Sequence, residues 1–139
     1  FTTQSYELFG GQTISVGNLL VTNDQDSLTI TYQTTGDWYI GKIHVYVGAL
    51  SGLPVNGQNA PVPGQFPYSE TYNPFTQTAT IHVALADLPA CYIIAAHAEM
   101  HKMVNGVDVQ QETAWSYGTP FQDTDRWGWT SDYCTQICE

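Results

Sequence analysis

Hydrophobic and polar residues alternate with a period of two along most of the chain. Between residues 27 and 35, Leu28, Ile30 and Tyr32 share one face while threonine and glutamine occupy the positions between them. Successive side chains of a β-strand point to opposite faces of a sheet, so this alternation predicts a half-buried strand. Turn residues divide the same pattern into seven or eight strands, and the clearest cover residues 11–22, 27–35, 38–47, 75–85, 92–103, 107–115 and 127–134.

The pattern predicts an all-β fold, and specifically an antiparallel two-sheet β-sandwich with Greek-key connections, immunoglobulin-like or jelly-roll-like. Asn105-Gly106 indicates a tight hairpin between two of the strands. Residues 92–103 begin apolar on both faces, which is typical of a central strand that is covered on each side. Residues 50–74 hold five of the seven prolines, so we expect a long loop there, functional or packed by its own aromatic residues.

The first ten residues stand outside the strand pattern. They contain four large apolar side chains, Phe1, Tyr6, Leu8 and Phe9, but little periodicity. We therefore expect residues 11–139 to form a single β-sandwich domain, and residues 1–10 to be a segment that docks on a neighbouring subunit. Free sheet edges accept such segments through main-chain hydrogen bonds. The alternative is that the segment lies along its own domain.

The chain is strongly acidic but sparsely charged. Thirteen acidic residues oppose three basic ones, for a formal net charge of −10, and only 12% of residues are charged. Such a charge repels phosphate backbones and anionic lipid surfaces, so we expect no nucleic-acid partner. The longest apolar runs, such as residues 91–96, are only as long as a strand, which excludes membrane insertion by an apolar helix.

The chain starts at Phe1, and we expect a mature secreted protein, extracellular or at the cell surface, from which a leader has been removed. A chain cut at a domain boundary would look the same. Three cysteines allow one internal disulfide. Cys91 opens one predicted strand and Cys134 closes another, so a Cys91–Cys134 bond is expected if these strands are antiparallel neighbours. Cys134–Cys138 is the rival pairing, and the third thiol is either free or makes a bond between chains.

Two groups of residues suggest metal ligands. His97, Glu99 and His101 project from one face of a strand, and two imidazoles with one carboxylate can hold a transition metal. Such a site would make the protein a metal-dependent enzyme, and His44 or His82 could complete it. Ordinary polarity of an exposed strand face explains the same spacing. Asp123 and Asp125 resemble a calcium-binding loop in carboxylate density, although aspartate is also a common turn residue. We expect no cofactor, with calcium as the alternative.

Aromatic residues near the C-terminus raise the possibility of carbohydrate binding. Sugars stack their C–H faces on flat aromatic rings, and acidic or amide side chains then bind the hydroxyl groups. Trp127 and Trp129 share one strand face and, with Tyr117, form a glycan platform if that face is exposed. If it faces another sheet, the same rings are core. No catalytic motif stands out: the chain lacks a G-x-S-x-G elbow, a P-loop and a G-x-G-x-x-G loop.

Four stretches of the chain together carry a family resemblance: residues 44–48 (HVYVG), 62–68 (VPGQFPY), 91–99 (CYIIAAHAE) and 112–115 (ETAW). The sequence resembles an uncharacterised β-sandwich module of secreted and cell-surface proteins of environmental bacteria, over residues 12–134. The resemblance implies a location at the cell exterior, often within larger surface proteins, and carries no catalytic residue with it. Here the module stands alone, which departs from that pattern.

These observations together predict a non-catalytic extracellular structural or adhesive protein. Its partners would be copies of itself, assembled into a filament or surface layer through residues 1–10. A carbohydrate-binding module with exposed aromatic residues is the alternative, and the metal-dependent enzyme is the third reading.

Overall fold

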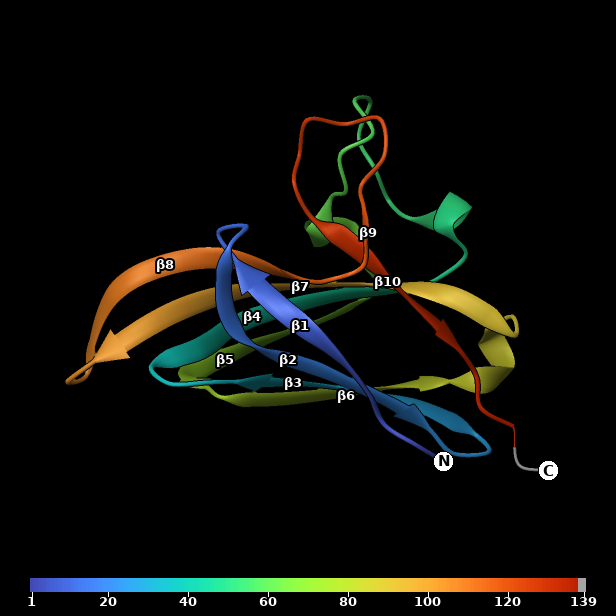
Figure 1. Ribbon diagram of the computed structural model, residues 1–139, viewed down its shortest axis with the longest axis horizontal. Helices are drawn as coiled ribbons and strands as arrows, with labels where there is room; N and C mark the ends of the chain where they lie inside the picture. The colour runs from blue at the N-terminus through green and yellow to red at the C-terminus, as the bar shows by residue number, and fades with distance from the viewer. Residues whose placement is uncertain (138–139) are drawn as a thin grey trace.

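Antiparallel strands make up the body of the protein. The computed structural model describes residues 1–137, and its strands are labelled in Figure 1. The strands are β1 (Gln4–Gly10), β2 (Ile14–Asn23), β3 (Ser27–Thr34), β4 (Trp38–Gly48), β5 (Tyr68–Thr76), β6 (Thr78–Ala84), β7 (Cys91–Val104), β8 (Val107–Ser116), β9 (Thr119–Pro120) and β10 (Trp129–Cys134). Three single-turn 3₁₀ helices are η1 (Leu50–Gly52), η2 (Pro63–Gln65) and η3 (Leu85–Asp87). Among residues 1–137, no helix is long and apolar enough to cross a membrane.

Eight strands form one sheet that is nearly closed into a barrel. Their order is β5-β4-β7-β8-β1-β2-β3-β6, and all neighbours are antiparallel. The two end strands, β5 and β6, follow one another in the chain with only Gln77 between them. Gln77 holds this corner, because its carbonyl accepts a bond from the Thr34 N–H and its amide donates to the Gly36 and Trp38 carbonyls. The all-β antiparallel prediction is confirmed, whereas the hydrogen bonds join the eight strands into one sheet and not into two.

The inner face of this sheet encloses the main hydrophobic core. Alternation places one set of side chains inside, so that Leu28, Ile30 and Tyr32 of β3 are fully buried, as the sequence pattern predicted. The even-numbered residues of β7 from Tyr92 to Met100 face the same core. Burying a large apolar side chain stabilises a fold by about 1.5–3 kcal/mol, so this interior is the main source of stability. The hydroxyl of Tyr32, which is fully buried, donates to the His97 carbonyl at 3.0 Å.

The N-terminal segment is part of its own domain. Residues 4–10 form β1, which pairs with β2 over its whole length and with β8 at Leu8–Gly10. Leu8 is fully buried in the inner core and Tyr6 packs against it. The prediction that residues 1–10 stand outside the strand pattern is therefore wrong, because residues 4–10 are a strand of this sheet. Phe9 faces outward at this position, and that broke the alternation by which the strand could have been recognised.

The loop predicted at residues 50–74 is shorter than expected. Its last part is β5, an edge strand that is largely exposed, packs Tyr68 and Tyr72 against the inner core and pairs with β4. Residues 49–67 do run without a long strand, and together with residues 117–128 they rise from one side of the sheet as a lobe (Figure 1). The two parts of the lobe touch, since the Asn59 side-chain amide donates to the Asp123 carbonyl at 3.3 Å.

The expected disulfide joins β7 to β10. Cys91 and Cys134 are bonded, and these two strands pair in antiparallel register from Cys134–Cys91 to Ser131–Ile94. The prediction from strand ends is confirmed. The third cysteine, Cys138, lies outside the described residues.

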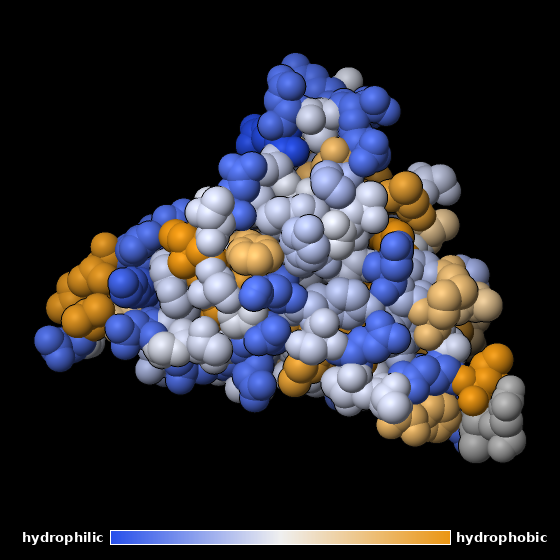
Figure 2. Space-filling view, viewed as in Figure 1, coloured by the Kyte–Doolittle hydropathy of each residue, from blue (hydrophilic) through white to orange (hydrophobic). Residues whose placement is uncertain are grey.

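The surface is uneven in hydropathy. Figure 2 shows a hydrophilic tip on the lobe and a hydrophobic patch at the free end of the β7–β8 hairpin. Val104, Val107 and Val109 of this hairpin are exposed. The hairpin turn is Asn105-Gly106, both with positive φ, as the sequence predicted.

Candidate carbohydrate-binding surface

A second apolar layer covers the outer face of β4, β7 and β8. The odd-numbered residues at the start of β7, Ile93 and Ala95, point away from the barrel and are nevertheless buried. They pack with Phe66 of the lobe and Trp115 of β8, and with partly buried rings around them. The prediction that β7 begins covered on both faces is confirmed, and the cover is the lobe.

Four aromatic side chains at the margin of this layer lie in mutual contact, and we call them the aromatic platform: Phe9, Tyr117, Trp127 and Trp129. Trp129 is at their centre, with its ring centroid 5.1 Å from Tyr117, 5.7 Å from Phe9 and 5.7 Å from Trp127. Phe9 and Tyr117 are themselves 5.7 Å apart in an edge-to-face arrangement. Tyr117 is 52% exposed, and the other three are half-buried. The predicted glycan platform residues are therefore together and reach solvent, joined by a ring from β1.

Gly128 explains how the chain holds two tryptophans on this surface. It has a φ of +142°, and a Cβ there would lie 2.4 Å from the Phe121 ring and 2.9 Å from Trp115. The backbone at this position can thus pack directly against the Phe121 and Trp115 rings only because glycine has no side chain. The residues on either side, Trp127 and Trp129, then stand on the same outer side and contact each other.

A polar row runs beside the platform. Directly opposed residues of antiparallel strands share a face, and alternation along β1 puts Glu7 on the outer face with Phe9. Glu7 is opposite Asn18 of β2. On its other side the Tyr117 N–H donates to the Glu7 carbonyl at 2.8 Å, so Tyr117 continues the register of β8. One cross-strand row on the outer face therefore consists of Asn18, Glu7 and Tyr117. The neighbouring row contains Phe9 and Trp115.

Glu7 is half-buried as a residue, and its carboxylate oxygens remain open to solvent. Among residues 1–137 the carboxylate has no hydrogen-bond partner and no ion pair. Its neighbour Asn18 uses one amide hydrogen on the Ser5 hydroxyl at 3.1 Å. The row therefore presents a strong acceptor and an amide next to flat apolar rings, and such combinations orient polar ligands in binding sites.

Two histidines lie under the outer layer. His97 is only 8% exposed, and its ring meets Trp115 at 4.7 Å and the cross-strand His44 at 5.7 Å. Both Nδ1 atoms are buried and have no hydrogen-bond partner among the described residues. Burial, and then the charge of His44, lowers the pKa of His97 to about 4. Burial and the nearby Lys42 also lower the pKa of His44, with Glu99 opposing them. Both imidazoles are neutral at neutral pH.

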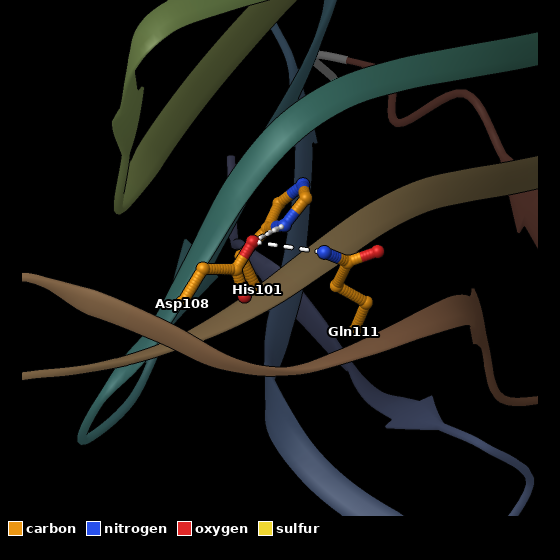
Figure 3. Close-up of polar contacts among 3 residues, drawn as sticks. All are labelled: His101, Asp108 and Gln111. Carbon is orange, nitrogen blue, oxygen red and sulfur yellow. Dashed lines mark hydrogen bonds and ion pairs between the residues drawn. The ribbon is translucent and has the colours of Figure 1, made fainter.

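The predicted metal site at His97, Glu99 and His101 is not formed. His97 is packed under Trp115, and Glu99 is exposed. His101 bonds through Nδ1 to Asp108 Oδ2 at 2.8 Å, an oxygen that also accepts from Gln111 (Figure 3). Within residues 1–137, no three His, Cys, Asp or Glu side chains are grouped to hold a metal ion.

The acidic loop at Asp123 and Asp125 lies at the tip of the lobe. Both residues are exposed, and they share a shallow hollow with Gln58 and Arg126. The guanidinium of Arg126 in the same hollow opposes the binding of a cation. Among residues 1–137, no third His, Cys, Asp or Glu side chain joins these two carboxylates in a group that could hold a metal ion, and the calcium site stays a prediction.

Sequence reasoning found three of the four platform rings and missed the polar row. Phe9 was assigned to self-assembly, and Glu7 and Asn18 were not singled out. The alternation of Glu7 and Phe9 with the buried Leu8 was the available signal, because it puts the acid and the ring on one face. Comparisons with models of protein families, with curated proteins and with solved structures found no match to this chain.

Proposed function

We propose that this protein is a non-catalytic extracellular module that binds carbohydrate on the aromatic platform. The observation that carries the proposal is the platform itself: four contacting rings at the surface, with Tyr117 half-exposed beside a carboxylate and an amide. Aromatic side chains offer large, stiff apolar surfaces for stacking, and a few polar groups then fix the orientation of the ligand.

The rigidity of the platform supports the same function. Its rings lie on strands β1 and β10 and on the segments next to them, and Gly128 fits against the buried Trp115 and Phe121 beneath. Rings that are held before the ligand arrives cost little entropy when it binds. A sugar ring would therefore meet a preformed surface.

An exterior location is part of the proposal. The disulfide supports an oxidising compartment, in which such bonds persist. The sparsely charged, acidic surface is in keeping with a protein that works outside the cell and not on nucleic acid. Adhesion follows as a consequence, because a protein at the cell surface that binds a polysaccharide attaches the cell to that polysaccharide.

We do not propose assembly through residues 1–10, since β1 is already paired with β2 along its whole length and with β8 at Leu8–Gly10. A separate observation favours self-association as a second candidate. Val107 and Val109 are 58% and 54% exposed on the part of β8 that extends beyond its pairing with β1. Unpaired edges of this kind accept another strand. Light scattering at rising protein concentration tests it, and a double variant with threonine at both valines should stay monomeric if the edge is used.

The test of the main proposal is binding to a panel of polysaccharides by affinity electrophoresis and calorimetry. We expect retardation by at least one polysaccharide, and loss of it in Tyr117→Ala and in Trp127→Ala. The matched control is Tyr39→Ala, a half-buried tyrosine of β4 that is not part of the platform. If no polysaccharide binds, or if Tyr39→Ala weakens binding as much as the platform variants, the proposal is wrong.

A further inference from the structure

Glu7 sets the chemistry of the ligand that the platform can accept. It is the acidic member of the polar row, half-buried next to Tyr117 and Phe9 and opposite Asn18. No hydrogen bond or ion pair within the described residues uses its carboxylate. Its oxygens are not among the buried polar atoms that lack a partner, so they face solvent and can accept hydrogen bonds from a ligand that supplies donors.

An ionised carboxylate only accepts hydrogen bonds. The group of the ligand that lies over Glu7 must therefore donate, and a hydroxyl group does so. A ligand carboxylate or sulfate at the same place would be repelled by the like charge.

The rest of the molecule does not offset this repulsion. The chain has three basic residues, Lys42, Lys102 and Arg126, against thirteen acidic ones. Lys42 is opposite Glu99 in the β4–β7 register, and Lys102 is on the part of β7 that pairs with Trp38 and Gln110, away from the platform. Arg126 precedes Trp127 directly, but Asp123 and Asp125 share its hollow. The approach to the platform is thus negative on balance, which slows anionic ligands.

We infer that the platform binds uncharged glycans through their hydroxyl groups and excludes glycans built from uronic acids or sulfated sugars, with Glu7 as the residue that makes this selection. The inference rests on the proposed carbohydrate-binding function and adds the ligand class to it. In this arrangement, the exposed ring of Tyr117 stacks on the sugar, the inclined rings of Trp129 and Phe9 flank it, Glu7 accepts from hydroxyl groups, and Asn18 contributes the amide. Ligands with acidic groups lose the Glu7 contact and meet its charge.

The experiment compares two probes with the intact protein: neutral homopolysaccharides of glucose, xylose and mannose, and polyuronates of galacturonic and guluronic acid. We expect measurable binding of a neutral chain and at least tenfold weaker binding of every polyuronate at low salt. Glu7→Gln, which keeps the shape and removes the charge, should weaken the neutral ligand about tenfold, the usual effect of losing a hydrogen bond to a charged group. The same variant should bind polyuronates more tightly than the wild type. Glu70→Gln, at an exposed carboxylate of β5, is the matched control and should leave both affinities unchanged.

The outcomes separate the inference from the function on which it rests. If no neutral glycan and no polyuronate binds, the carbohydrate-binding function itself is wrong. If the wild type binds polyuronates as tightly as neutral chains, or if Glu7→Gln and Glu70→Gln behave alike, the ligand class is wrong while the binding function stands.

Discussion

The two apolar layers of this protein, inside the barrel and outside it, differ in composition and in cover. The inner core is mainly leucine, isoleucine, valine and alanine, and it is enclosed by hydrogen-bonded strands. The outer layer is mainly aromatic and is covered by the lobe, and its margin is open to solvent at the platform.

One strand serves both layers, because the side chains of β7 alternate between them. Its even-numbered residues face the barrel, and its odd-numbered residues Ile93, Ala95 and His97 lie under the lobe and Trp115. The inner layer is held by closure of the sheet, whereas the outer layer is held by the two loops of the lobe, residues 49–67 and 117–128. We therefore expect the inner core to decide whether the chain folds, and the outer layer to tolerate changes that alter binding.

The largest expected effect is the loss of an inner side chain. Leu8→Ala removes a fully buried leucine from β1, and we expect the free energy of unfolding to fall by about 4 kcal/mol, within the range for buried leucines. Leu50→Ala, at an exposed leucine of the lobe, should have almost no effect. Urea denaturation measures both. Equal stability of the two variants would mean that β1 is not part of the core.

The disulfide fixes β10 to β7 and so links the two layers. Replacing both Cys91 and Cys134 by alanine opens a link between residues 43 apart, and chain entropy predicts a loss of about 3 to 4 kcal/mol. Because β10 carries Trp129, carbohydrate binding should weaken in the same variant. Calorimetric unfolding and a binding titration measure the two effects. A variant as stable as the wild type would show that the strand pairing alone holds β10.

Acid should lower the free energy of unfolding through the outer layer, because His97 lies there and the inner core has no histidine. The pKa of His97 is about 4 in the folded protein and about 6.5 when the side chain is exposed. Between these values the unfolded chain binds a proton that the folded chain does not, so stability is complete above pH 6.5 and falls as the pH falls. The loss reaches about 3 kcal/mol below pH 4. The lowered pKa of His44 acts in the same direction.

The test is the slope of the free energy of unfolding between pH 7 and pH 4. His97→Gln cannot titrate and should flatten this slope, whatever its stability at pH 7. His82→Gln, at an exposed histidine of β6, should keep the wild-type slope. If the two variants have the same pH profile, the acid response does not come from His97.

The smallest expected effect on stability is at the platform. Tyr117→Ala removes a half-exposed ring, and the free energy of unfolding should change by no more than about 0.5 kcal/mol, as at other surface positions. Thermal unfolding measures this change. A larger loss would show that Tyr117 is structural, and its effect on binding could then not be assigned to the ligand.

How much of the fold and of the candidate site could be predicted from the sequence depends on whether a feature follows local alternation or cross-strand register. Alternation identified β3 and β6 because one face of each is buried and the other is polar, and it identified most of β7 although that strand begins buried on both faces. It failed at β5, where Pro74 and exposed polar residues interrupt the pattern around Tyr68 and Tyr72, and at β1, where Phe9 is apolar but points outward. Closure of the sheet depends on Gln77 and on register between distant strands, and local periodicity does not encode it. The row of Asn18, Glu7 and Tyr117 depends on the same cross-strand register, whereas the sequence alone already offered His44 as a neighbour of His97.

The claim that the outer rings bind a ligand while the inner core does not can be tested in one titration. The chain has four tryptophans: Trp38 in the inner core, Trp115 buried in the outer layer, and Trp127 and Trp129 on the platform. Their four indole N–H signals can be followed by NMR as a neutral oligosaccharide is added. We expect the Trp127 and Trp129 signals to shift in a saturable way, and the Trp38 signal to stay in place. No shift at Trp127 and Trp129 on addition of an oligosaccharide that the protein retains, or an equal shift at Trp38, would contradict the account.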